Sequence, residues 1–291
     1  MANKKEKHEK PIHELLKFSI LNIDKSSGPT SFSVSDFVRK QLSKYGVNKT
    51  SHFGTLDPKV SGVLPIALGR ACKLTGFFLG HDKTYVGIMH VHNEISLEKL
   101  QEVINRKFIG KIMQLPPKKS RVKRQERERE IILFELLEKN EKDFLFKTKV
   151  QGGTYIRKLI HDLGLEVEVN GAHMLELRRT DAGIFSENDS SFVNLYDFQK
   201  AIEGERELRK ILVPAEEAIK KVMPCVQINK KNKGEVKKLL TGKPIFRNSL
   251  ESLPDLEEGG VFAIFEGEKF IEIAKRVSEG DIIARPEFVF N

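Results

Sequence analysis

The sequence has 291 residues, 39% of them hydrophobic, which is enough for one large domain and a small one and excludes a wholly disordered chain. Its formal net charge of +9 favours a polyanionic partner such as RNA or DNA. Cys72 and Cys225 form no CxxC pair, so neither a zinc cage nor a thioredoxin-like site is indicated. We expect free thiols in a reducing cytoplasm, and no apolar stretch predicts a membrane helix.

The N-terminal residues 1–17 begin with a stretch, residues 1–10, that is rich in lysine and glutamate and has no apolar core. They are expected to form a flexible, solvated tail rather than a signal peptide. A short strand is predicted at 18–23. Ser33 or Ser35 then follows a clear turn and is expected to cap a helix that ends at Gly46.

The segment from 52 to 69 contains too many helix breakers for a helix and is expected to be a folded loop with a strand at 63–68; the breakers are Gly54, Pro58, Gly62, Pro65 and Gly69. Asp57 lies in this loop, directly before a proline. Alone, the Asp-Pro pair is typical of a turn. A carboxylate held on a constrained loop beside a buried strand, however, also suits a nucleophile or base.

The middle of the chain alternates between strand and helix patterns. Strands are predicted at 85–91, 131–137 and 144–150, and helices begin at Ser96 and after Gly152-Gly153-Thr154. Between them, residues 115–130 read LPPKKSRVKRQERERE, a basic run that could be a solvated hairpin or could contact an RNA backbone. His90 and His92 share one strand face, but without a third ligand at a sensible spacing a structural role is favoured over a metal site.

The C-terminal residues 223–291 differ from the rest of the chain in the pattern of their predicted elements. A short helix is predicted around 236–240, followed by short strands separated by glycine turns, at 261–265, 270–274 and 281–284. Such a pattern is typical of a small β-barrel. We therefore place a domain boundary near residue 222.

Four stretches resemble, in the same order, the motifs of the TruB family of pseudouridine synthases: Asp24–Ser31, GTLDPKVSGVLPIALGRACKL around Asp57, Lys83-Thr84-Tyr85, and Gly153-Thr154-Tyr155-Ile156-Arg157. Leu177-Arg178-Arg179-Thr180 also fits. The resemblance covers about residues 20–185. It implies an α+β pseudouridine synthase fold over residues 18–222, with a mixed, largely antiparallel sheet flanked by helices, and a PUA-like RNA-binding β-barrel over 223–291.

The resemblance also implies an active site that needs no cofactor and no metal. Asp57 is the implied nucleophile, and Arg157 the cation that would hold its charged carboxylate. Tyr85 would stack on a uracil flipped out of the RNA, His52 would help to seat that base, and Leu177 would form a pocket wall. Read alone, Tyr85 and Leu177 are ordinary core positions, His52 a loop residue, and Arg157 a solvated arginine.

Residues 115–129 resemble the archaeal branch related to dyskerin, whose members act in H/ACA guide-RNA particles. That likeness implies RNA backbone contacts by the basic residues Lys118, Lys119, Arg121, Lys123 and Arg124. It also implies guide RNA and small particle proteins as partners, besides a tRNA or rRNA substrate. The first motif departs from the family because its proline stands after Gly28. In the basic run, Arg121 stands where the family has a small residue.

Three functional hypotheses follow. The leading one is an RNA pseudouridine synthase, either guided inside an H/ACA particle or acting alone on the TΨC loop of tRNA (uridine 55). A second is a non-catalytic RNA-binding scaffold, which would have no need of Asp57, Tyr85 and Arg157 together. A third, a PUA-bearing methyltransferase, is disfavoured because no glycine-rich nucleotide loop follows a strand.

Overall fold

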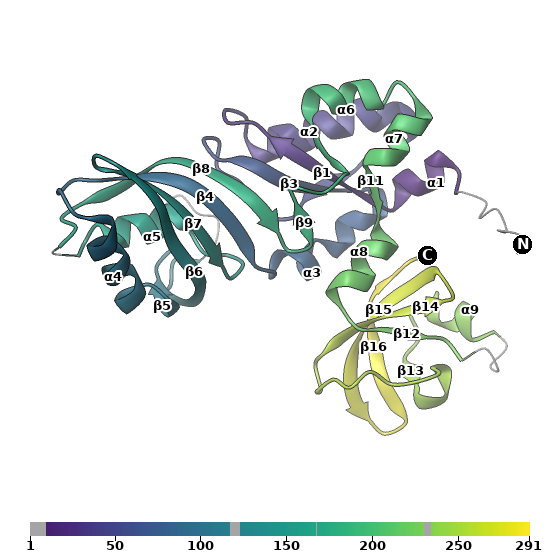
Figure 1. The fold of residues 1–291 in the computed structure, drawn as a ribbon. Coiled ribbons are helices and arrows are strands. Elements are labelled where there is room, and N and C mark those ends of the chain that lie inside the picture. The colour runs from purple at the N-terminus through teal and green to yellow at the C-terminus, as the bar shows by residue number, and fades with distance from the viewer. Residues whose placement is uncertain (1–9, 117–122, 167, 230–233) are drawn as a thin grey trace, which may run out of the picture. The chain divides into compact units, whose positions relative to one another are not determined.

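The structure is a computed structural model, and it describes residues 10–116, 123–166, 168–229 and 234–291 (Figure 1). The chain folds as two compact units. The larger contains residues 21–212, and the smaller combines residues 1–20 with 213–291. Within the described residues, no helix has the length and apolar character needed to cross a bilayer.

The larger unit is built on one mixed sheet with the strand order β10-β1-β3-β8-β4-β7-β6-β5, with β2 beside β3 and β9 beside β8. The pairs β1–β10 and β3–β8 are parallel, and the pairs from β8 to β5 are antiparallel. The strands are β1 (Ser19–Lys25), β2 (Thr50–His52), β3 (Ser61–Leu68), β4 (Lys83–Val91), β5 (Gly110–Gln114), β6 (Arg127–Asn140), β7 (Asp143–Val150), β8 (Ala172–Ala182), β9 (Phe185–Ser186) and β10 (Phe192–Asn194).

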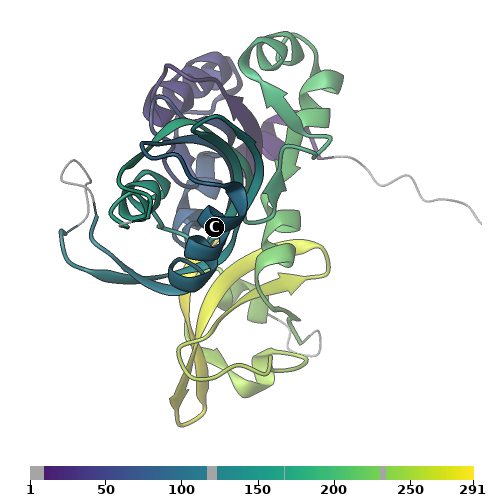
Figure 2. The same cartoon turned by 60° about the vertical axis from the view of Figure 1, so that its left-hand side comes forward.

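The helices of the larger unit cover parts of this sheet. α2 packs against β2 and β3, α4 against β6, and α5 against β8. The strands curve around α5 (Figure 2), whose apolar residues Ile156, Leu159, Ile160 and Leu163 are buried. The helices are α2 (Ser31–Leu42), α3 (Thr75–Leu79), α4 (Leu97–Lys107), α5 (Ile156–Leu163), α6 (Leu195–Ala201) and α7 (Glu205–Ile211), with 3-10 turns at Ser43–Tyr45 and Gly69–Leu74.

The predicted elements of this unit are confirmed in type, with one wrong cap. Strands β1, β3, β4, β6 and β7 and helices α4 and α5 form where the sequence indicates them. Helix α2, however, is capped by Thr30, whose Oγ1 accepts the Ser33 N–H at 3.0 Å, and not by Ser33 or Ser35. The first residue after the turn has the extended backbone that a cap requires, whereas Ser35 is buried and bonds Thr50.

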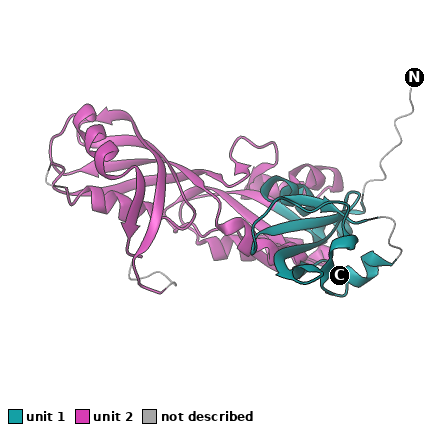
Figure 3. Cartoon of the chain, turned by 90° about the horizontal axis from the view of Figure 1, so that it is seen from below, with its two compact units in different colours: residues 1–20, 213–291 teal, residues 21–212 magenta. Residues whose placement is uncertain are grey.

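The smaller unit (Figure 3) contains a curled sheet with the order β12-β14-β15-β16-β13. Its elements are α1 (Ile12–Lys17), α8 (Ala215–Val222), β12 (Cys225–Gln227), α9 (Glu235–Leu239), β13 (Ile245–Phe246), a 3-10 turn at Arg247–Ser249, β14 (Val261–Glu266), β15 (Lys269–Glu279) and β16 (Ile282–Val289); β11 (Leu212–Pro214) leads into α8. This arrangement confirms the predicted α+β class with a small C-terminal β-structure.

Backbone bonds between the two outer strands of this sheet bring it close to a closed barrel. Ile228, just after β12, forms a bridge with Leu250, just after β13. Asn229 N–H donates to the Ser249 carbonyl at 2.9 Å, and Glu251 N–H to the Gln227 carbonyl at 3.0 Å. These bonds satisfy groups that a sheet edge would leave unpaired, and they surround a core of apolar side chains from every strand.

The tail expected at 1–17 is partly a helix. Residues 1–9 lie outside the described residues, but Ile12–Lys17 form α1. The reason is burial: Leu16 is fully buried, and Phe18 packs against the rings of Phe270 and Phe290, with centroid distances of 5.5 and 4.3 Å. The two compact units divide after residue 212, before α8. The domain boundary that the sequence indicates near residue 222 stays a prediction.

Glu272 of β15 is a buried carboxylate in this smaller unit. Its side chain is fully buried, and neither oxygen has a hydrogen-bond partner. Burial raises the pKa of Glu272 from 4.5 to about 8. Between these two values the folded chain holds a proton that the unfolded chain has lost. The free energy of unfolding therefore falls as pH rises through this window, by up to about 1.4 kcal/mol per pH unit.

We predict that Glu272→Gln removes this loss, because an amide does not ionise. Urea unfolding between about pH 5 and 8 should give a flatter pH dependence than the wild type and a more stable variant at the alkaline end. Glu279→Gln is the control, since Glu279 lies on the same strand but is exposed and paired with Arg285. Equal pH slopes for Glu272→Gln and the wild type would contradict the prediction.

Candidate active site

Asp57 begins a tight turn directly before β3. The Val60 N–H donates to the Asp57 carbonyl at 3.0 Å. The preceding residue, Leu56, is buried, and the Ser31 hydroxyl both accepts its N–H at 2.8 Å and donates to its carbonyl at 2.9 Å. Asp57 can therefore be both a turn residue and a positioned carboxylate, because the turn fixes the backbone that carries its side chain.

Lys25, at the end of β1, anchors the other side of this turn. Its side chain is fully buried, and its ammonium donates to the carbonyls of Pro58 at 3.1 Å, Val60 at 2.7 Å and Ser26 at 3.0 Å. Burial lowers the pKa of Lys25, and the negative charge of Asp57 partly opposes this. Lys25, which belongs to the first family-like motif, thus holds the backbone of the Asp57 turn in place.

Arg157, in the first turn of α5, forms an ion pair with Asp57. Arg157 Nη2 lies 2.7 Å from Asp57 Oδ2, and both side chains are about half exposed. The start of α5 is fixed by the buried Gln114, whose amide accepts the Tyr155 N–H at 2.8 Å and donates to the Tyr155 carbonyl at 3.2 Å. Arg157 is therefore paired with Asp57, and is not simply a solvated arginine.

Arg179 of β8 is a buried cation behind the Asp57 loop. It is 1% exposed, its Nε donates to the Val63 carbonyl at 2.8 Å, and its Nη2 donates to the Gly54 carbonyl at 3.0 Å. Tyr85 of β4 stands opposite it across the strand pair. Burial lowers the pKa of Arg179. The guanidinium thus joins the loop before Asp57 to strand β3.

Gly62 allows β3 to approach β8 beside this arginine. Its φ is +101°, and a Cβ atom there would lie 2.2 Å from the Arg179 carbonyl oxygen. No other residue fits this position without moving the backbone. The glycine is therefore a requirement of the site and not only a loop feature.

Tyr85 and Leu177 line one face of the paired strands β4 and β8. Tyr85 stands opposite Arg179, and Leu177 opposite Gly87. Gly87 has no side chain, and a Cβ there would lie only 2.8 Å from Leu177 Cδ1. Both side chains are nearly buried, so they form an apolar surface beside the charged groups.

His52 closes the loop from the other end. Its Nε2 lies 3.0 Å from the Thr55 hydroxyl, two residues before Asp57. Burial and the nearby charge of Arg179 lower the pKa of His52. The imidazole is thus neutral at neutral pH and is available as a hydrogen-bonding group rather than as a cation.

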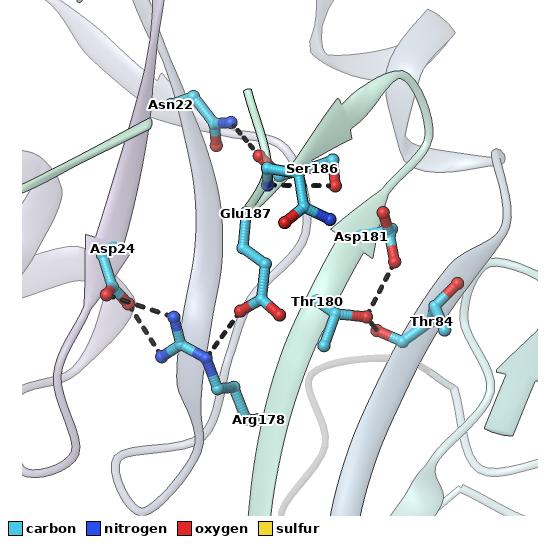
Figure 4. A network of polar contacts seen from close by, with 9 residues as sticks. Asn22, Asp24, Thr84, Arg178, Thr180, Asp181, Ser186 and Glu187 are labelled. Carbon is cyan, nitrogen blue, oxygen red and sulfur yellow. Dashed lines mark hydrogen bonds and ion pairs between the residues drawn. The ribbon is translucent and has the colours of Figure 1, made fainter. Parts of the chain in front are cut away.

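Figure 4 shows a polar network around Arg178 and Thr180 of β8. Arg178 makes a two-pronged contact with Asp24, at 3.0 and 3.2 Å, and its Nε donates to Glu187 at 2.7 Å. Because Asp24 precedes Lys25, this network holds the end of β1 in place. Thr180 also bonds Asp181 and the Thr84 carbonyl.

Lys83 completes a set of three buried cations. Its ammonium donates to the carbonyls of Leu79, at 2.6 Å, and of His81. Burial and Arg179 lower its pKa to about 8. Lys25, Lys83 and Arg179 occur in the family-like motifs, but sequence reasoning assigned them no role. A basic residue inside an otherwise apolar strand pattern was the available signal.

The remaining predicted residues are exposed, bond other partners, or lie outside the described residues. Lys123 and Arg124 are exposed in the loop before β6, whereas Lys118, Lys119 and Arg121 lie outside the described residues. His90 bonds Asp143, and His92 bonds His173. Across the described ranges, no group of three or more His, Cys, Asp or Glu side chains could hold a metal ion.

Two family models match residues 40–220, which include most of the larger unit and the start of the C-terminal part of the smaller one. The model for the N-terminal domain of TruB family pseudouridylate synthases covers residues 40–156, and that for the C-terminal domain of tRNA pseudouridylate synthase B covers residues 157–220. A probable tRNA pseudouridine synthase B from Nanoarchaeum equitans is 46% identical over 218 residues, 73% of this chain and 61% of that protein. One from Methanocaldococcus jannaschii is 44% identical, covering 75% and 65%. The chain thus spans less than two thirds of these relatives.

Solved structures match almost the whole chain. The structure of a Cbf5–Nop10–Gar1 complex contains a chain 34% identical to this one, with a TM-score of 0.87, covering 97% of this chain and 88% of that chain. The archaeal box H/ACA sRNP Nop10–Cbf5 complex gives 32% identity and a TM-score of 0.84, with 97% and 89% covered. At these identities the likeness extends beyond fold to family.

The two cations that contact the Asp57 segment should differ in their effect on stability. Arg157→Ala removes an exposed ion pair and should lower the free energy of unfolding by less than about 1 kcal/mol. Lys25→Met removes the ammonium donor from three carbonyls, of which that of Val60 is buried, and should cost about 2–4 kcal/mol. Urea unfolding of both variants measures the difference. Equal losses would mean that Lys25 is not the anchor of the turn.

Proposed function

This chain belongs to the TruB family of pseudouridylate synthases, and we propose that it isomerises uridine to pseudouridine in RNA, with Asp57 as the nucleophile. The observation that carries the proposal is the Asp57–Arg157 ion pair at 2.7 Å, formed between segments a hundred residues apart in sequence. An isolated exposed pair adds little stability. Its role is therefore better sought in chemistry.

The proposed reaction exchanges one glycosidic bond for another and moves one proton. The bond from ribose C1′ to N1 of the base breaks, and a bond from C1′ to C5 forms, while C5 loses a proton and N1 gains one. The product has the same composition as the substrate, so no oxidant, reductant or cofactor is required. The Asp57 carboxylate acts on the nucleotide, and Arg157 orients it and offsets its repulsion from RNA phosphates.

The uridine must leave the base stack before Asp57 can reach it, which costs a few kcal/mol. The surface formed by Tyr85 and Leu177 would receive the flipped base, with the tyrosine ring stacked on it. His52, kept neutral by burial and by Arg179, would help to seat it. The three buried cations Lys25, Lys83 and Arg179 add a positive potential that suits a polyanion.

Guided action in an H/ACA-type particle is the proposed setting. The Cbf5 chains that match 97% of this chain were solved with Nop10 or with Nop10 and Gar1, and one related structure is an H/ACA RNP bound to a substrate RNA. We propose guide RNA and small particle proteins as partners, with rRNA and tRNA uridines as substrates. Stand-alone action on tRNA is the second candidate, favoured by the names of the curated relatives.

The C-terminal unit is proposed to be a PUA-like RNA-binding domain over 223–291, which would hold the RNA while the larger unit performs the chemistry. The exposed Lys123 and Arg124 are proposed to contact the RNA backbone. The reducing cytoplasm is the proposed compartment, which suits the free thiols of Cys72 and Cys225. A non-catalytic scaffold is less favoured, because it would not need the paired Asp57 and Arg157.

The test is a map of pseudouridine in tRNA and rRNA incubated with the purified chain, alone and then with guide RNA and partner proteins. Asp57→Asn should lower the rate by at least about 1,000-fold, because the amide is a poor nucleophile. Asp36→Asn is the matched control, since Asp36 is an aspartate paired with Arg39 and Lys40 on α2.

Pseudouridine that appears only with guide RNA would support the guided mode, and pseudouridine without it the stand-alone mode. Full activity in Asp57→Asn would overturn the assigned nucleophile. No pseudouridine under any condition, with a folded wild-type chain, would favour the scaffold.

A further inference from the structure

The turn that ends α3 is in close backbone contact with the segment that leads to Arg157. A Cβ atom on Gly152 would lie 2.6 Å from the carbonyl oxygen of Leu79 and 2.8 Å from that of Gly80. These distances are well below a van der Waals contact, so the two backbones can meet here only because Gly152 has no side chain. Since Gly152 lies five residues before Arg157, the contact limits where the first turn of α5 can lie.

The same turn also borders the loop that leads to Asp57. A Cβ atom on Gly54 would lie 3.9 Å from Leu79 Cδ2 and 3.8 Å from Lys83 Cε, which are ordinary van der Waals distances. Gly54 lies three residues before Asp57. Residues 79–81 thus contact both the segment that carries the carboxylate and the segment that carries its cation, and we call them the spacer turn.

Lys83 holds the spacer turn from the interior of the fold. Its ammonium donates to the carbonyls of Leu79, at 2.6 Å, and of His81, and only 5% of the residue is exposed. Burial and the charge of Arg179 lower the pKa of Lys83 to about 8, so the fold bears a cost for keeping this amine charged. A costly cation that donates to this turn suits a task in positioning it.

We propose that the spacer turn sets the separation of Asp57 and Arg157 during the isomerisation, and that Lys83 is the positioning residue that holds the turn. The 2.7 Å ion pair is about half exposed and would be weak on its own, so its geometry has to come from the backbone around it. The inference rests on the proposed function, since it concerns the reactive carboxylate of that reaction. It adds Lys83 and Gly152 to the residues on which the rate depends.

The test places the same methyl group at two positions near this turn. Gly152→Ala pushes a methyl against the Leu79 carbonyl, so the segment before Arg157 must shift. The single-turnover rate of pseudouridine formation should fall about 100-fold, as for a displacement of about 1 Å, with little change in the RNA dissociation constant. Gly76→Ala on α3 is the matched control, because a Cβ there meets nothing within 4 Å, and it should keep the wild-type rate.

A double-mutant cycle separates positioning from a merely structural role. If Gly152→Ala acts through Arg157, it should cause a much smaller further loss in an Arg157→Ala background. An undiminished loss in that background, or a wild-type rate in Gly152→Ala alone, would overturn the proposal. A wild-type chain that is inactive even with guide RNA and partner proteins would instead count against the proposed function, which keeps the two failures distinct.

A second variant does not depend on how Gly152→Ala folds. Lys83→Met removes the donor to the spacer turn and leaves its backbone contacts in place, so the single-turnover rate should fall about tenfold through a smaller displacement. Lys149→Met is the control, since Lys149 is a neighbouring lysine that is about half exposed, and urea unfolding checks that both variants are folded. A folded Lys83→Met with the wild-type rate would show that Lys83 does not position the pair.

Discussion

The guanidinium of Arg179 is the contact on which the rest of the site depends. It lies in the interior of the larger unit and bonds backbone carbonyls before and after Asp57, those of Gly54 and Val63. Burying a charge is costly unless it is well bonded. This cost is offset only if loop and strand keep their positions, so the same interaction that constrains the fold also fixes the Asp57 carboxylate.

Rigidity and accessibility are combined around Asp57. Its backbone neighbours are tied down by Ser31 and Lys25, which hold Leu56, Pro58 and Val60. Its side chain, in contrast, remains about half exposed beside Arg157. A reactive group needs this division, because its frame must not move while its substrate must reach it. The stability of the region therefore resides in the anchors and its proposed reactivity in the exposed pair.

Sequence reasoning predicted the strands β1, β3, β4, β6 and β7 of the larger unit but did not identify β8 as a strand. That strand carries Arg178 and Arg179 side by side, one facing the network with Asp24 and the other buried. Alternation of apolar and polar residues marks a strand only when the buried positions are apolar. The buried Arg179 breaks this pattern, so β8 was not recognised as a strand.

The sequence by itself determined the α+β class, the family and the identity of Asp57, Tyr85 and Arg157 as candidates, because ordered local motifs carry that information. Only the tertiary structure decided the geometry of the Arg157–Asp57 pair that the resemblance implied, that Lys25 and Arg179 anchor the loop, and that residues 12–17 form α1. The physical reason is that each of these depends on burial and on bonds between distant segments. A linear pattern records which residues are present, and not which backbone carbonyls the fold brings to them.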